Sequence, residues 1–202
     1  METLIKVVGC LVSCACCAAG VTFLVYLGIF AFNNPNPEAW YATKGTDESL
    51  FKDEAAATAA GYSDLDNVHG HFVTWFLWGF LNAVIPMGLA LIAGLCMLIS
   101  PRAGQVVGSL AGCGGCSGLA WYIAGLCWRF RASGKYASGD WVVDNREAWI
   151  TAVTADDYTG LFQYASGNFM WVYFLITWIL MAVGCFCSLT TFIVMCTCLK
   201  TH

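Results

Sequence analysis

Charged side chains are scarce in this chain of 202 residues, where Asp, Glu, Lys and Arg together make up 11 % of the composition. None of them, and no histidine, lies in the central part of a long apolar run. Proton relays, voltage sensors and most ion-coupled transport paths depend on such groups near the middle of a membrane. The sequence therefore argues against transport by that chemistry.

Recognisable catalytic patterns are absent as well. The chain has no H-x-x-x-H metal pair, no nucleophile beside a base and no glycine-rich phosphate loop after a strand. We therefore expect a protein that is not an enzyme and holds no cofactor. Its expected partners are membrane lipid and other membrane subunits or copies of itself, with no nucleic acid among them.

Cysteine is missing from the two long polar segments, residues 33–71 and 131–167, so no disulfide can hold either of them. The chain nevertheless contains 12 cysteines, most of them toward the chain ends or the short turn. In a reducing cytoplasm, thiols beside a membrane are candidates for S-palmitoylation, and Cys10, Cys196 and Cys198 are the best placed. The alternative is that cysteine acts here as a small hydrophobe that packs well.

Long apolar runs dominate what is present, since 59 % of the residues are hydrophobic. A helix of about 20 apolar residues crosses a bilayer. Four runs reach that length: residues 6–32, 72–100, 103–130 and 168–199. The short turn between the second and third runs predicts an antiparallel hairpin. We expect an all-α membrane protein, a single four-transmembrane-helix bundle over residues 1–202, in which the two long polar segments are extramembrane loops carrying short helices.

The distribution of Lys and Arg predicts the orientation. Four crossings place both termini and the short turn on one side of the membrane and both loops on the other. Raw counts favour neither side strongly, and acidic residues are a weak guide to topology. The cations of the terminal side are concentrated near the chain ends and the turn, whereas those of the loops are spread out. We therefore expect both termini in the cytoplasm.

The third apolar run carries glycines at a spacing that stacks several of them on one helix face. Small residues four apart allow a second helix to approach closely. The glycines concerned are Gly104, Gly108, Gly112, Gly114 and Gly118. We expect them to form a helix-packing face, although membrane helices are also glycine-rich in general.

The second apolar run contains four residues of interest. Trp75 and Trp78 are typical of the aromatic belt at a membrane interface. An unpaired amide is costly in hydrocarbon, so Asn82 is expected to bond a neighbouring helix. Pro86 removes a backbone hydrogen bond and predicts a kink.

Both loops contain helix and turn signals. Thr46, followed by two acids, resembles the N-cap of a short surface helix that ends near Gly61. A capping-box pattern at residues 144–147 predicts a second short helix through Trp149. The segments YASGD at 136–140 and YASGN at 164–168 bracket the second loop and suggest a symmetric pair of turns, with chance as the alternative.

A small group of metal-binding residue types precedes the second run. Carboxylates beside an H-x-H pair are able to bind a divalent cation. The residues are Asp64, Asp66, His69 and His71. We favour the simpler interpretation that they are polar groups at a membrane boundary, so no metal is expected.

The loops are rich in large amphipathic side chains of the sort found at the centres of protein interfaces. The expected loop interface consists of Trp40, Trp141 and Trp149, together with Arg129 and Arg131 at the end of the third run. The arginines are expected to meet acids such as Glu54, Asp156 or Asp157. The alternative is that the aromatic rings fold back on the membrane surface.

One family resemblance is carried by the second half of the chain, through the sequence WYIAG at 121–125, then Trp128 and Phe130, and a last run ending in the cysteines at 185, 187, 196 and 198. These motifs resemble the transmembrane protein 272-like group of four-span proteins. The resemblance implies a four-helix membrane protein of poorly defined role and transfers no catalytic residue. Claudins and tetraspanins share only the layout, because their characteristic loop cysteines are missing here.

The sequence thus favours a structural tetraspan that packs laterally into a homo-oligomer or a larger membrane assembly. One alternative is the subunit of an oligomeric channel, with a pore lined by glycines and by hydroxyls such as those of Ser117, Thr177, Ser188 and Thr190. Another is an accessory subunit of a respiratory or photosynthetic complex. Helix-to-helix hydrogen bonding is the expected role of the hydroxyls if no pore forms.

Overall fold

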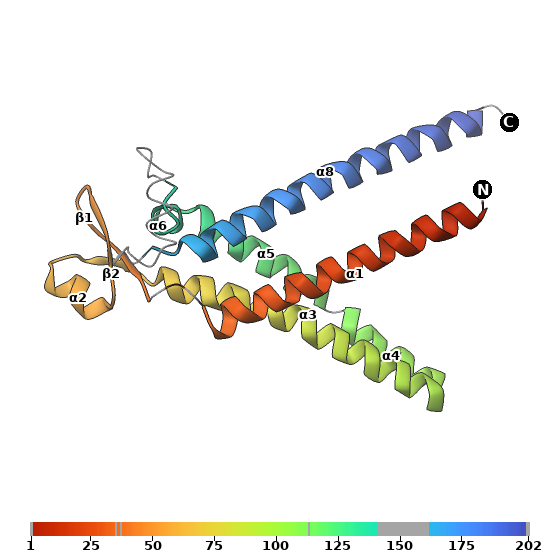
Figure 1. The fold of residues 1–202 in the computed structure, drawn as a ribbon, viewed down its shortest axis with the longest axis horizontal. Helices are drawn as coiled ribbons and strands as arrows, with labels where there is room; N and C mark the ends of the chain where they lie inside the picture. Colours follow the sequence, from red (N-terminus) through yellow and green to blue (C-terminus); the bar gives the residue numbers. More distant parts are fainter. Residues whose placement is uncertain (1, 35, 37, 113, 141–161, 201–202) are drawn as a thin grey trace.

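A computed structural model describes residues 2–34, 36, 38–112, 114–140 and 162–200. Most of this part of the chain is helical, in the elements α1 (Glu2–Phe32), α3 (Val68–Ile99), α4 (Pro101–Gly112), α5 (Gly114–Phe130) and α8 (Tyr164–Lys200). Four of these helices, α1, α3, α5 and α8, each have one end at a small folded head that contains three strands and two short helices, α2 (Glu54–Ala59) and α6 (Ala132–Ala137), whereas α4 lies beside the outer half of α3 (Figure 1). Both termini and the turn between α3 and α4 lie at the end away from the head (Figure 1).

Two helices are long and apolar enough to cross a membrane within the described residues: α3, and α8 over Tyr164–Thr190. A shorter apolar stretch, Cys17–Phe32, forms the head-side half of α1. The predicted third run corresponds to α4 and α5, which lie on either side of residue 113, a residue outside the described part of the chain. The structure therefore supports two membrane-spanning helices by length and composition, and the four-span arrangement stays a prediction.

The all-α prediction is wrong in the first loop, where β1 (Trp40–Lys44), β2 (Asp47–Phe51) and β3 (Asp64–Asp66) form an antiparallel sheet in the order β2-β1-β3. Gly45, with φ 66°, lies in the two-residue turn that joins β1 to β2. The predicted helix start at Thr46 is therefore a hairpin turn. The helix begins later, where the Asp53 carboxylate accepts a 2.7 Å hydrogen bond from the Ala56 amide.

The core lies where α1, α3, α5 and α8 meet close to the head, and it is largely aromatic. Phe72, Trp75, Phe76 and Phe174 are fully buried there. The Trp75 and Trp121 rings stack at 4.6 Å, and each indole nitrogen donates to the backbone carbonyl of the other residue, at 3.1 and 2.7 Å. Trp75 is thus a core residue that ties α3 to α5, and the prediction that it belongs to an interface belt is wrong.

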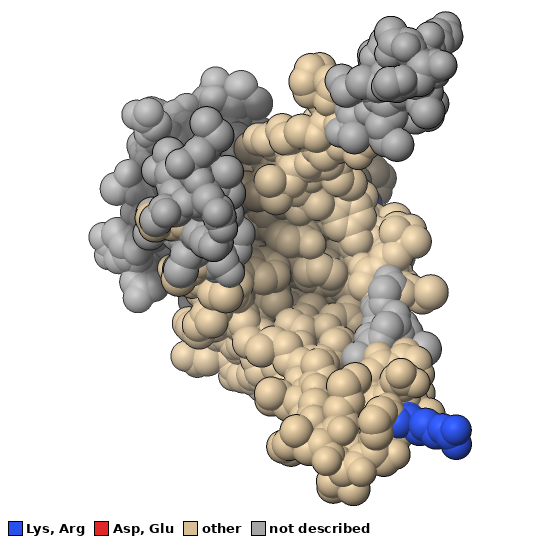
Figure 2. Space-filling view, turned by 90° about the vertical axis from the view of Figure 1, so that its right-hand side faces the viewer, with Lys and Arg blue, Asp and Glu red and all other residues tan. Residues whose placement is uncertain are grey.

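The opposite end of the bundle has no comparable core among the described residues. The outer halves of α3 and α8 expose large apolar side chains, among them Leu91, Leu95, Ile99, Leu180 and Phe186. Figure 2 looks at this end and shows no acidic side chain on the described surface. These helix surfaces need a non-aqueous environment or a protein partner, because exposed apolar patches of this size are rare on soluble monomers.

The predicted glycine face is only partly in contact with another helix. A Cβ added at Gly104 would lie 2.1 Å from Met97 Cγ of α3, so this glycine allows the α3–α4 hairpin to close. A Cβ added at Gly108 would lie 3.9 Å from Ala93 Cβ, an ordinary van der Waals distance. Nothing lies within 4 Å of a Cβ added at Gly118 among the described residues. Gly112 ends α4 and Gly114 begins α5, and their surroundings lie outside the described contacts. Within the chain, the packing face is therefore shorter than predicted.

Candidate functional site

The most enclosed charged group in the described chain is Arg129, in the last turn of α5, which is 3 % exposed. Its Nε donates a 2.8 Å hydrogen bond to the Gly167 carbonyl. Its two terminal nitrogens donate to the two carboxylate oxygens of Asp140, at 2.7 and 2.8 Å. A bidentate pair of this kind fixes the relative position of its partners. Arg129 therefore joins the end of α5 to the segment after α6 and to the first turn of α8.

The two YASG segments meet at this arginine. The first ends α6, and its Gly139 has φ 73°, a backbone conformation that favours glycine. The second begins α8, so the two segments are not a symmetric pair of turns. A Cβ added at Gly167 would lie 2.0 Å from Ser138 Oγ, and the Gln163 amide donates to the Ala137 carbonyl at 2.7 Å. The repeated YASG motif thus marks two segments, at the end of α6 and the start of α8, that pack against each other.

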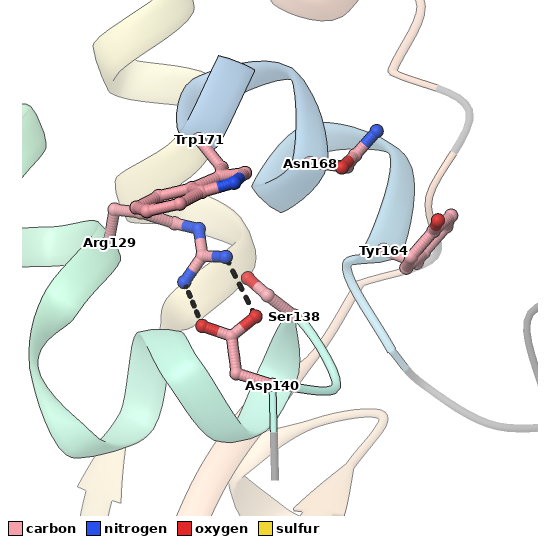
Figure 3. A pocket seen from close by; sticks show the side chains of 6 residues that line it. All are labelled: Arg129, Ser138, Asp140, Tyr164, Asn168 and Trp171. Carbon is pink, nitrogen blue, oxygen red and sulfur yellow. Dashed lines mark hydrogen bonds and ion pairs between the residues drawn. The ribbon is translucent and has the colours of Figure 1, made fainter. Parts of the chain in front are cut away.

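A cavity of about 210 Å³ lies beside the arginine, lined by Arg129, Ser138, Asp140, Tyr164, Asn168 and Trp171 (Figure 3). The Ser138 hydroxyl is buried and has no hydrogen-bond partner among the described residues. The ion pair largely neutralises the charge of this cavity, and no lining residue is a nucleophile placed beside a base. The arrangement fixes the end of α5 relative to the start of α8 and the segment after α6.

A second polar cluster lies at the start of α3. The Asp66 carboxylate accepts a hydrogen bond from Arg131 and a 2.9 Å hydrogen bond from His71 Nε2. The His71 ring stacks on Trp128 at 5.0 Å. Burial raises the pKa of Asp66, but hydrogen bonds from His71 and Ser133 and the Arg131 charge outweigh burial and lower this pKa from its ordinary value.

The four candidate metal-binding residues do not converge on one point. His71 and Asp66 bond each other, whereas His69 Nδ1 lies 3.1 Å from Gln163 Oε1. Asp64 is exposed. In the described part of the chain, no group of three or more His, Cys, Asp or Glu residues is arranged to hold a metal ion.

The two loops contact each other within the chain, and the predicted role of the loops in assembly stays a prediction. Tyr41 of the first loop meets Tyr136 of the second at 5.6 Å, and the Tyr136 hydroxyl donates to the Glu48 carbonyl at 3.0 Å. Trp40 is half-buried at the start of β1. Trp141 and Trp149 lie outside the described residues, as does the predicted helix at 144–149.

Arg129 and Arg131 meet acids other than the predicted ones. Their partners are Asp140 and Asp66, not Glu54, and Asp156 and Asp157 fall outside the described residues. The residues that sequence reasoning missed are Asp140, Gly167 and Gln163. The repeated YASG motif was the one signal that pointed to the first two.

Polar side chains inside the helical region behave in two ways. Ser117 links helices, since it accepts from Trp78 Nε1 at 3.0 Å and donates to Asn82 Oδ1 at 2.8 Å. The predicted bond from Asn82 to a neighbouring helix is therefore present. The hydroxyls of Thr177, Ser188 and Thr190 instead donate to carbonyls of their own helix, α8. Helix-to-helix bonding was the wrong expectation for these three.

Three cysteines were singled out for acylation: Cys10, Cys196 and Cys198. They belong to α1 and α8, but their side chains lie outside the described residues. Acylation at these positions stays a prediction, which an intact-mass measurement of the native protein tests.

A comparison of the chain with models of known protein families, with curated proteins and with solved structures finds no match. The resemblance to the transmembrane protein 272-like group therefore stays a prediction.

Proposed function

We propose that this chain is a four-span structural membrane protein that packs laterally, either with copies of itself or within a larger membrane assembly. The observation that supports this proposal most strongly is the exposure of large apolar side chains along the outer part of α8. This helix contacts the rest of the described chain through its head-side part, where Met170 and Phe174 are fully buried and the Trp178 ring stacks on Phe130 of α5 at 5.9 Å. Beyond them, its apolar side chains are exposed, with Leu180 at 65 % and Phe186 at 69 %.

A bilayer alone would solvate this helix, but close helix packing is favoured by its small residues. Gly184 and Ser188 lie four apart on α8, the spacing that allows two membrane helices to approach closely. Among the described residues, nothing lies within 4 Å of a Cβ added at Gly184, so no described side chain of the same chain covers this surface. The surface is therefore open to a helix from another chain.

The hydrogen bonding of α8 favours a structural role over a channel subunit. Thr177, Ser188 and Thr190 direct their hydroxyls to carbonyls of their own helix. A hydroxyl satisfied in this way is compatible with an apolar neighbour. A pore lining needs polar groups directed at the permeating species, and these three residues are not so directed. An accessory subunit of a larger complex remains a form of the same proposal.

The test is the native size of the chain extracted in mild detergent, compared with that of Gly184→Leu. The added side chain projects into open space, so the monomer should keep its thermal stability while the assembly dissociates. Val183→Leu is the matched control, because it enlarges an already large, exposed residue on the same turn. If the assembly survives Gly184→Leu, this surface of α8 is not the contact between chains. If the wild-type chain is a monomer without partners, the proposed lateral packing is wrong.

A further inference from the structure

A cavity of about 480 Å³ opens in the head, between one face of the sheet and the start of α6. The pairing register places Tyr41 opposite Asp66 and Thr43 opposite Asp64. Alternate residues of a strand point to the same face, so all four side chains share the face that lines the cavity. Arg131 and Ser133 line the cavity from the other side.

The charges in this cavity are of both signs and do not cancel. Asp66 is already paired with Arg131 and bonded to His71. Asp64 is exposed, and its carboxylate forms no hydrogen bond or ion pair within the described residues. One carboxylate is therefore left for a cation.

Arg131 retains hydrogen-bonding capacity in the same cavity. A guanidinium has five N–H donors, and the bond to Asp66 involves only one terminal nitrogen of Arg131. Its side chain is 39 % exposed, so the remaining donors are accessible to an anion. The cavity thus presents an accessible anion-binding group and an accessible cation-binding group together.

The cavity also lies where the apolar helices end. Arg131 directly follows α5, and Asp66 precedes α3 by two residues. The stacked rings of His71 and Trp128 lie next to this cluster, and aromatic rings of this kind are typical of the headgroup level of a membrane. If the helices span a bilayer, as the proposed function requires, the cavity is at the depth of lipid headgroups.

We propose that this cavity binds a zwitterionic phospho-ammonium group, with the ammonium on Asp64 and the phosphate on Arg131. The phosphatidylethanolamine headgroup and soluble phosphoethanolamine both have this chemistry. A purely anionic headgroup has no ammonium group for Asp64. It would be attracted by the Arg131 guanidinium but repelled by the carboxylates of Asp64 and Asp66. The site therefore discriminates by the ammonium group.

The experiment measures binding of three probes to the purified full chain in detergent: dihexanoyl phosphatidylethanolamine, dihexanoyl phosphatidylglycerol and phosphoethanolamine. We expect the ethanolamine lipid to bind more tightly than the glycerol lipid, by about tenfold, which is typical of a hydrogen bond between charged groups. Asp64→Asn should abolish this preference. Asp47→Asn is the matched control, because it removes the same charge from β2 at a position outside the cavity. Arg131→Gln should weaken both lipids.

Each outcome bears on the proposal. Phosphoethanolamine that binds as tightly as the lipid indicates a soluble ligand, and binding of the lipid alone indicates a membrane ligand; both support the site. Equal binding of the two lipids, or a preference unchanged in Asp64→Asn, overturns it. Asp64 is exposed, so this variant should fold even if Arg131→Gln does not. A wild-type chain that assembles but shows no preference between the two lipids contradicts the site alone, whereas a wild-type monomer that shows the preference contradicts the proposed lateral packing alone.

Discussion

The head-side end of the helix bundle and the end that carries the termini differ in what covers their side chains. At the head-side end, aromatic rings from α1, α3, α5 and α8 bury one another, and Arg129 is enclosed with its partners. At the other end, α3 packs mainly on α4, and α8 exposes most of its length. The chain therefore supplies its own core at one end only.

This difference separates two sources of stability. Side chains of the head-side core are held by protein contacts, which a substitution removes. Side chains of the far end are exposed within the described chain, so shortening one of them removes few contacts that the protein itself makes. The comparison predicts that equal truncations at the two ends have unequal effects.

Phe72→Ala should have the largest effect. Phe72 is fully buried in the aromatic core, and loss of a buried ring typically costs about 3–5 kcal/mol. Leu95→Ala, at the exposed end of α3, should change stability by about 0.5 kcal/mol or less. Thermal unfolding of both variants in the same detergent measures the difference. Equal losses would show that the far end is also a protein core.

Arg129→Ala should be next. Removing one partner of a buried ion pair typically costs about 3 kcal/mol, and this variant also loses the bond to the Gly167 carbonyl. Asp140 is 27 % exposed, so water will offset part of this cost. The paired change Arg129→Met with Asp140→Leu leaves no lone charge and should recover part of the loss. If the double variant is no more stable than Arg129→Ala, the loss of stability does not come from the unpaired carboxylate of Asp140.

Sequence reasoning succeeded where a local pattern is sufficient. The apolar runs marked the long helices, and the short turn at Pro101 marked the α3–α4 hairpin. The polar amide in an apolar run correctly indicated that Asn82 bonds a second helix. Each of these inferences depends on residues adjacent in the chain or on a requirement that any apolar medium imposes.

It failed where distant segments decide the outcome. The stretch after Lys44 contains both a helix-cap pattern and a hairpin turn with glycine, and pairing of β1 with β2 and β3 selects the turn. Trp75 looks like a belt residue until α5 brings Trp121 against it. Arg129 meets Asp140 because α6 turns the chain back toward the end of α5. The spacing of residues in the sequence does not predict this turn.

A smaller effect is expected from pH at the head. In the folded chain, hydrogen bonds from His71 and Ser133 and the Arg131 charge outweigh burial and lower the pKa of Asp66 from its ordinary value. A lowered folded-state pKa stabilises the fold above the unfolded-state pKa, and this stabilisation is lost as the pH falls through the folded-state value. The unfolding midpoint should therefore decrease on acidification below about pH 4. Asp66→Asn should weaken this decrease and Asp47→Asn should not; identical profiles for both variants would contradict the assignment.

The central claim is that the exposed outer half of α8 lies inside a membrane. Site-resolved labelling with a water-soluble maleimide tests it in sonicated membrane fragments, which are accessible from both sides. Cys185 on α8 is exposed in the chain, and Asp64→Cys supplies an accessible thiol in the head. We predict rapid labelling at residue 64 and labelling of Cys185 only after detergent denaturation. Equally rapid labelling of both thiols in intact membranes would contradict it.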